Sequence, residues 1–140
     1  MIVDDHEGVR TMLRTILSMK GLRVLVSANG EDALRICRRF SRPIDMLITD
    51  VELPKLSGFD LAELAARVRP AMPILFISGG FNEQDPEVQE RLGPGRAFLE
   101  KPFDIDRLAS KMESIMMAVP EPAALLDPVH ISFQNQSRSA

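Results

Sequence analysis

Charged and hydroxyl side chains follow four short apolar segments of the sequence, at the points where those segments end. They are Asp4 and Asp5 after the first segment, Asp50 after the third, Ser78 after the fourth and Lys101 after the fifth. If the segments are strands of one parallel sheet, their carboxyl ends meet at one edge, where open α/β sheets bind ligands. These side chains are therefore expected to lie close together.

Three neighbouring carboxylates repel one another, at a cost on the order of 4 kcal/mol per pair at ~4 Å. A cation would relieve that repulsion. The ligands are hard oxygens without a Cys or His cluster, so Mg²⁺ is expected, with Mn²⁺ as the alternative, rather than zinc. Since Mg²⁺ is commonly held by one or two carboxylates beside a phosphate, the pattern indicates phosphoryl chemistry.

Each of the other side chains has a role in such chemistry. Asp50 would be the oxygen nucleophile that accepts the phosphoryl group as an acyl phosphate. Ser78 would donate a hydrogen bond to a phosphoryl oxygen, and Lys101 would place a positive charge against it. The neighbouring His6 is expected to be exposed near the start of a helix, and we assign it no role.

Five strand–helix units are predicted to position these residues. The strands are continuous apolar runs, as expected for a parallel sheet covered on both faces. Connections of this length imply a doubly wound α/β sandwich. The predicted strands are 1–3, 23–28, 44–49, 73–77 and 97–99. The predicted helices are 7–20, 31–40, the segment after Gly58, a short helix that starts near Pro86, and 104–118. Asp85 would cap the short helix, and Ile105 would lie on the buried face of the last helix.

Length and composition exclude several other classes of protein. The 140 residues, 45% hydrophobic and 26% charged, are ordinary for one globular domain. No apolar run approaches the roughly 20 residues of a membrane span, so no membrane association is expected. The single Cys37 indicates a cytoplasmic location. A net charge of −3 without a basic block gives no reason to expect a nucleic-acid partner.

Five motifs that occur in order resemble the receiver domain of bacterial two-component response regulators of the chemotaxis-regulator type. They are Val3-Asp4-Asp5, Leu47-Ile48-Thr49-Asp50, Pro54…Gly58, Ser78-Gly79 and Lys101-Pro102-Phe103. The resemblance implies a flavodoxin-like fold, with a five-stranded parallel sheet of order 2-1-3-4-5 and helices on both faces. We expect a receiver domain over residues 1–118 and a mostly disordered C-terminal tail over 119–140.

The resemblance also implies a set of metal ligands. Asp50 would be the phosphoacceptor, which takes its phosphoryl group from a sensor histidine kinase or a histidine phosphotransfer protein. Asp5 and Asp50 would bind Mg²⁺ directly, together with the main-chain carbonyl of Glu52. Asp4 would act mostly through water.

The family's switch maps onto further residues. Ser78 matches the hydroxyl that moves onto the phosphoryl group, and Lys101 matches the lysine that pairs with it. Phe98 matches the aromatic residue that turns inward when the hydroxyl moves. The bond before Pro102 would be cis, although cis bonds are only about 5–6% of X–Pro bonds in folded proteins.

We therefore expect a phosphorylation-controlled signalling switch without an attached output domain. The protein would be a monomer or weak dimer and would act by binding a downstream protein. It would not be an enzyme beyond removing its own phosphoryl group. A non-phosphorylated adaptor, a receiver module of a hybrid histidine kinase and a magnesium-dependent phosphatase are the alternatives. The phosphatase would need a second aspartate where Glu52 stands.

Overall fold

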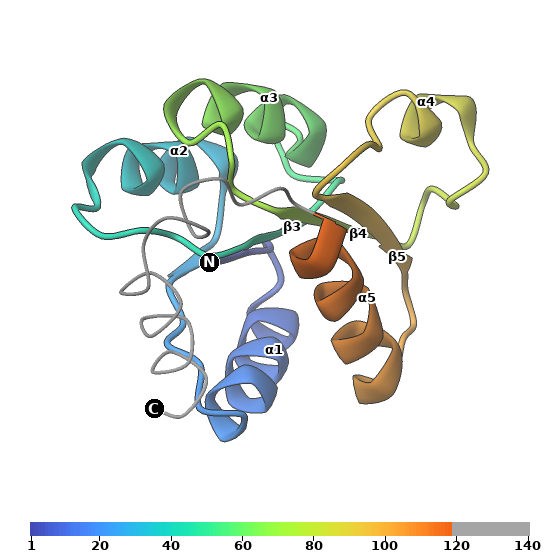
Figure 1. Cartoon of the computed structure of the whole chain (residues 1–140), viewed down its shortest axis with the longest axis horizontal. Helices are drawn as coiled ribbons and strands as arrows, with labels where there is room; N and C mark the ends of the chain where they lie inside the picture. Colours follow the sequence, from blue (N-terminus) through green and yellow to red (C-terminus); the bar gives the residue numbers. More distant parts are fainter. Residues whose placement is uncertain (119–140) are drawn as a thin grey trace.

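Five parallel strands form the central sheet of the computed structural model, which describes residues 1–118 (Figure 1). Their order across the sheet is β2-β1-β3-β4-β5, which confirms the expected order. The prediction of a disordered tail over 119–140 lies outside the described residues. The strands are β1 (Ile2–Val3), β2 (Val26–Ser27), β3 (Leu47–Asp50), β4 (Ile74–Ser78) and β5 (Arg96–Glu100).

Helices cover both faces of the sheet, so the doubly wound architecture is confirmed. Figure 1 shows α1 and α5 on one face and α2, α3 and α4 on the other. None of the helices within residues 1–118 is long and apolar enough to cross a membrane. The helices are α1 (Glu7–Met19), α2 (Gly30–Arg39), α3 (Gly58–Val68), α4 (Pro86–Gln89) and α5 (Ile105–Ala118).

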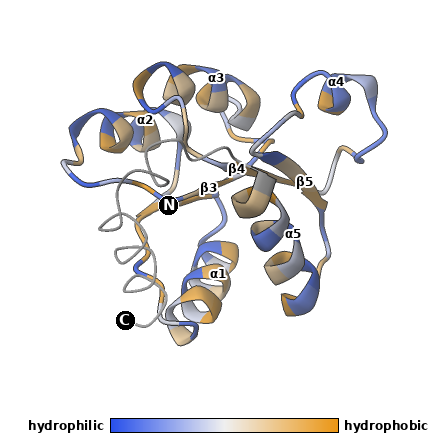
Figure 2. Cartoon of the chain, in the orientation of Figure 1, coloured by the Kyte–Doolittle hydropathy of each residue, from blue (hydrophilic) through white to orange (hydrophobic). Residues whose placement is uncertain are grey.

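Two hydrophobic clusters lie on opposite sides of the sheet, and adjacent residues of one strand belong to different clusters. Phe76 of β4 packs with Phe59 of α3 at a ring-centroid distance of 5.2 Å. Its neighbours Leu75 and Ile77 belong to the cluster that includes Leu13 of α1. Successive side chains of a strand point to opposite faces, so both must be apolar here. This explains the apolar run at the start of β4, and Figure 2 shows hydrophobic colouring in the central strands.

Side chains and backbone at the helix ends explain where several helices start and end. The side chain of Asn29 accepts a hydrogen bond from the backbone N–H of Asp32 (2.7 Å) at the start of α2. Ser57 does the same for Asp60 (3.1 Å) at the start of α3. Gly21, whose φ is 81°, lies just beyond the end of α1, as expected for a helix stop.

The structure also corrects the expectations in detail. β2 pairs over two residues only, because the two-residue β1 offers it no further partners. Asp50 and Ser78 are the last residues of their strands rather than the first residues of loops. Asp85 occupies the N-cap of α4, but its side chain accepts from the N–H of Asn82 instead of capping the helix. Ile105, the first residue of α5, is 49% exposed rather than buried.

Candidate functional site

The carboxyl edge of the sheet brings together residues that are about 50 and 100 positions apart in the chain. The ammonium group of Lys101 lies 3.1 Å from Asp4 Oδ2 and 3.4 Å from Asp50 Oδ1. Both carboxylates are buried, and Asp50 is only 3% exposed. The backbone N–H of Lys101 donates to the carbonyl of Ser78 (2.8 Å), and the bond from Lys101 to Pro102 is cis. The backbone after β5 therefore holds Lys101 over the two carboxylates.

Burial dominates the electrostatics of Asp50. It raises the pKa of this carboxyl to about 7, with Lys101 opposing the shift and the negative charges of Asp4 and Glu52 adding to it. Burial acts to lower the pKa of Lys101, but the hydrogen bond to Asp4 and the charge of Asp50 outweigh it, so this pKa lies above its ordinary value. The lysine stays charged, and one lysine does not compensate all of the negative charge at this edge.

The remaining carboxylate, Asp5, lies on the open side of the edge. Oxygen atoms of Asp4, Asp5 and Asp50 and a ring nitrogen of His6 all lie within 4.8 Å of one another. Three hard oxygen donors at this spacing suit a small divalent cation, and the excess of negative charge favours one. The residues thus fit the Mg²⁺ ion that the sequence predicts at this edge.

Ser78 has a partner that the sequence analysis did not identify. Its hydroxyl donates to Oε1 of Glu52, and the same oxygen accepts from the N–H of Gly80 (2.9 Å). A Cβ at Gly80 would lie 2.6 Å from this oxygen, so the missing side chain makes room for the carboxylate. Partial burial acts to raise the pKa of Glu52, but the hydrogen bonds from Ser78 and the backbone hold it below its ordinary value.

The loop after β3 packs directly against the phosphoacceptor candidate. The N–H of Gly58 donates to the carbonyl of Val51 (2.9 Å). A Cβ at Gly58 would lie 2.1 Å from the carbonyl oxygen of Asp50. No side chain fits there, and this explains why glycine follows the loop at the first position of α3.

Phe98 lies away from these polar groups, inside the hydrophobic cluster of the face covered by α2, α3 and α4. It is 1% exposed and stands opposite Phe76 in the register of β4 and β5. The ring is therefore turned inward in this structure. Its role as a moving switch residue stays a prediction.

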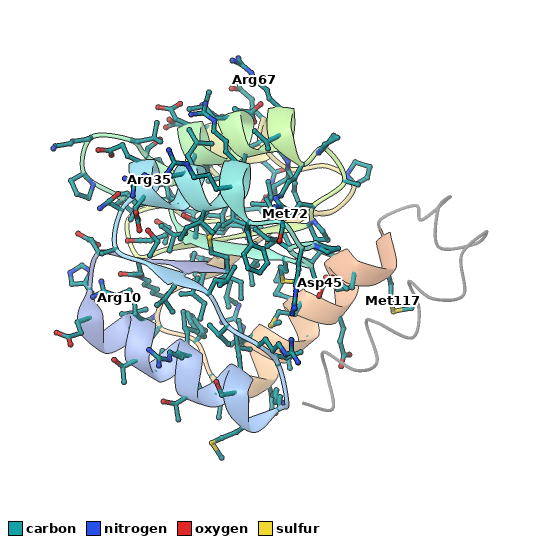
Figure 3. The ribbon with its side chains drawn as sticks, turned by 90° about the vertical axis from the view of Figure 1, so that its left-hand side faces the viewer. Arg10, Arg35, Asp45, Arg67, Met72 and Met117 are labelled. Atoms are coloured by element: carbon teal, nitrogen blue, oxygen red, sulfur yellow. The ribbon has the colours of Figure 1, made fainter. Side chains whose placement is uncertain are left out.

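A cavity of about 800 Å³ lies at the opposite end of the sheet from the acidic edge. Its walls are the segments that precede β2 and β3 and the last turns of α5. Figure 3 labels Asp45 and Met117, which belong to two of these walls. The cavity is mostly apolar and contains none of the sequence-predicted site residues, so it has no part in the chemistry of the carboxyl edge.

Comparison with known proteins gives relatives that include a sensor kinase and a transcriptional regulator. The chain is 32% identical over 108 residues to the autoinducer 1 sensor kinase/phosphatase LuxN of Vibrio campbellii, covering 77% of this chain and 12% of that protein. It is 30% identical over 116 residues to the transcriptional regulatory protein CpxR of Escherichia coli, covering 83% and 48%. The chain thus spans less than half the length of these two curated relatives.

Solved structures agree with the architecture. The receiver domain from the hybrid histidine kinase CckA is 33% identical, with a TM-score of 0.68 over 82% of this chain and 95% of that one. A receiver domain protein from Clostridium thermocellum has a TM-score of 0.73 over 90% and 96%, and at 24% identity it supports the fold alone. The family model described as "response regulator receiver domain" matches residues 1–113. Since that match covers most of the chain, the protein belongs to the response regulator receiver domain family.

Proposed function

We propose that this domain is a phosphorylation-controlled switch whose phosphoacceptor is Asp50. The observation that carries the proposal is the position of the Lys101 ammonium group, 3.1 Å from Asp4 and 3.4 Å from Asp50. A buried carboxylate at the end of a central strand, with a lysine and further acids around it, has the parts that phosphoryl transfer to an aspartate requires.

In the proposed step, an ionised oxygen of Asp50 attacks the phosphorus atom of a phosphohistidine. The bond between phosphorus and the imidazole nitrogen breaks, and its electron pair stays on that nitrogen, which leaves an acyl phosphate on Asp50. Lys101 is already charged and close to the reacting oxygen, so it stabilises the negative phosphoryl oxygens without prior rearrangement.

The divalent cation would be held by Asp5, Asp50 and the main-chain carbonyl of Glu52, with Asp4 acting through water. When bound, Mg²⁺ supplies positive charge to the phosphoryl oxygens and to the crowded carboxylates. Asp4 meanwhile keeps Lys101 in place through its other oxygen.

Phosphorylation would then be sensed through Ser78 and Phe98. The Ser78 hydroxyl must leave Glu52 to reach a phosphoryl oxygen, which changes the loop after β4 because the N–H groups of Gly80 and Phe81 also donate to it (3.0 and 2.9 Å). Phe98 would respond to the movement of the Ser78 hydroxyl, starting from a ring that is already buried before phosphorylation.

The proposed partners are a sensor histidine kinase or a histidine phosphotransfer protein, and a downstream protein that binds one phosphorylation state. We place the domain in the cytoplasm as a monomer or weak dimer that acts on no substrate but its own phosphoryl group. A second candidate function, the receiver module of a hybrid histidine kinase, is favoured by the similarity to LuxN and to the receiver domain of CckA.

Incubation with a small acyl-phosphate donor and Mg²⁺ tests the proposal, with intact-mass measurement as the readout. We expect one phosphoryl group per chain in the wild type and in Asp60→Asn, which changes an exposed aspartate of α3, and none in Asp50→Asn. No label on the wild type would favour the adaptor alternative. Sustained release of phosphate over many turnovers would favour the phosphatase.

A further inference from the structure

The imidazole ring of His6 lies against the acidic edge rather than away from it. Its Nδ1 atom is 3.1 Å from Asp5 Oδ1 and 3.3 Å from Asp4 Oδ1. Adjacent ligands of one octahedral ion, bound at about 2.1 Å, are separated by about 3 Å. The ring nitrogen therefore lies where a neighbouring ligand of the proposed cation would lie, which the sequence analysis did not foresee.

The backbone holds the ring in this place. His6 is the N-cap residue of α1, with the extended conformation φ −92° and ψ 118°, and its side chain makes no capping hydrogen bond to the helix. Its N–H donates to Asp4 Oδ1 (2.8 Å), and its carbonyl accepts from the N–H of Arg10 (3.1 Å). The guanidinium of Arg10, labelled in Figure 3, donates to the carbonyl of Asp4 (2.8 Å). These bonds connect the turn to both β1 and α1.

The acidic edge has a neutralised side and an open side. Asp4 and Asp50 are buried and paired with Lys101. Asp5 and His6 are not among the partners of that lysine in residues 1–118, and their side chains are 34% and 71% exposed. A cation can therefore enter from solvent on this side, and an exposed ring can adjust its torsion angles to bind it at little cost.

We propose that Nδ1 of His6 is a ligand of the divalent cation in this pocket, and that it makes the site prefer Mn²⁺ to Mg²⁺. The inference rests on the proposed function, because it concerns the same pocket. In the metal-free protein Nδ1 is the donor in its hydrogen bond to Asp4 Oδ1, because a carboxylate oxygen only accepts. A bound cation would replace that proton, and a neutral ring with its proton on Nε2 then presents a lone pair at Nδ1. Imidazole is a common ligand of first-row transition metals, whereas Mg²⁺ is bound through oxygen. A mixed set of carboxylate oxygens and one nitrogen therefore adds affinity for Mn²⁺ but not for Mg²⁺.

Calorimetric titration of the metal-free full chain with MgCl₂ and with MnCl₂ tests the preference. We expect His6→Gln to weaken Mn²⁺ binding about tenfold or more and to change Mg²⁺ binding by less than about threefold, since glutamine offers oxygen but no imidazole. The matched control is His130→Gln, which removes the chain's other histidine and should leave both affinities unchanged.

Pulsed electron paramagnetic resonance of the Mn²⁺-loaded protein provides a second readout that does not depend on affinity. A directly bound ¹⁴N modulates the electron spin echo, so we expect this modulation in the wild type and in His130→Gln and its loss in His6→Gln. Binding of Mn²⁺ without nitrogen modulation, or an equal loss of both affinities in His6→Gln, would overturn the inference and leave the proposed pocket intact. Failure of the wild type to bind either ion would overturn both proposals.

Discussion

Replacing Asp50 by asparagine is expected to stabilise the metal-free protein at pH 8. The cause is the burial that raises the pKa of Asp50 from 3.8 to about 7 in the folded state. Below pH 3.8 both states hold the proton, so the group does not affect stability. As the pH rises from about 4 to about 7, the unfolded chain releases a proton that the folded chain retains, and folding becomes progressively less favourable.

The magnitude follows from the size of the shift. The two pKa values differ by roughly 3 units, and each unit corresponds to ~1.4 kcal/mol. Ionisation of the buried Asp50 carboxyl therefore lowers the free energy of unfolding by up to about 4 kcal/mol above pH 7. Asparagine has the same shape and still offers an oxygen to Lys101, but it loses the attraction between opposite charges. We therefore expect a net stabilisation of roughly 1–3 kcal/mol at pH 8.

Urea unfolding with a chelator present, at pH values from 4 to 8, measures this difference. The stability gain of Asp50→Asn over the wild type should be small near pH 4, should grow up to about pH 7 and should then level off. Saturating Mg²⁺ should shrink it, because the ion binds the folded carboxylates of the wild type. The control Asp60→Asn removes a charge from an exposed position and should show no such growth.

The reasoning would be refuted if Asp50→Asn were no more stable than the wild type at pH 8, or if the difference between them did not increase with pH. Either result would mean that the carboxylate is solvated or compensated well enough in the folded protein to titrate as it does in the unfolded chain.

Three further predictions concern single residues. Asp5→Asn should weaken Mg²⁺ binding about tenfold or more by calorimetry, because it removes a carboxylate ligand; an unchanged affinity would exclude Asp5 from the site. Glu52→Ala should lengthen the half-life of the acyl phosphate on Asp50 several-fold, because it removes an acceptor that can orient the attacking water. Intact-mass measurement over time follows this half-life, and a half-life equal to that of the wild type would show that the role is wrong. Urea unfolding of two glycine variants tests the packing at α3. Gly58→Ala should lower the free energy of unfolding by about 2 kcal/mol or more, because its Cβ would lie 2.1 Å from a backbone oxygen. The control Gly8→Ala, whose Cβ would have nothing within 4 Å, should raise the free energy of unfolding by about 0.5–1 kcal/mol.

Several features of the fold could be predicted because their causes are local. The apolar side chains of β4 favour burial whatever their neighbours are. The side chain of Asn29 caps α2 by bonding to the backbone only three residues away. Once the strands are assigned to a parallel sheet, the edge that carries Asp50, Ser78 and Lys101 follows, since strand ends determine it. The predictions failed where neighbours in space decide, as in β2, whose length is limited by the two residues of β1.

The sequence by itself therefore determined the order of the elements, the doubly wound architecture and the identity of the residues at the carboxyl edge, because apolar periodicity and turn residues act over a few positions. Only the tertiary structure decided what those residues touch. It sets the distance of Lys101 from Asp50, directs the Ser78 hydroxyl to Glu52 and places ligand atoms of Asp5 and His6 within 4.8 Å of Asp50. These contacts depend on how separate strands and loops meet in space, and burial among them determines the pKa of Asp50. No local pattern in the chain encodes such distances.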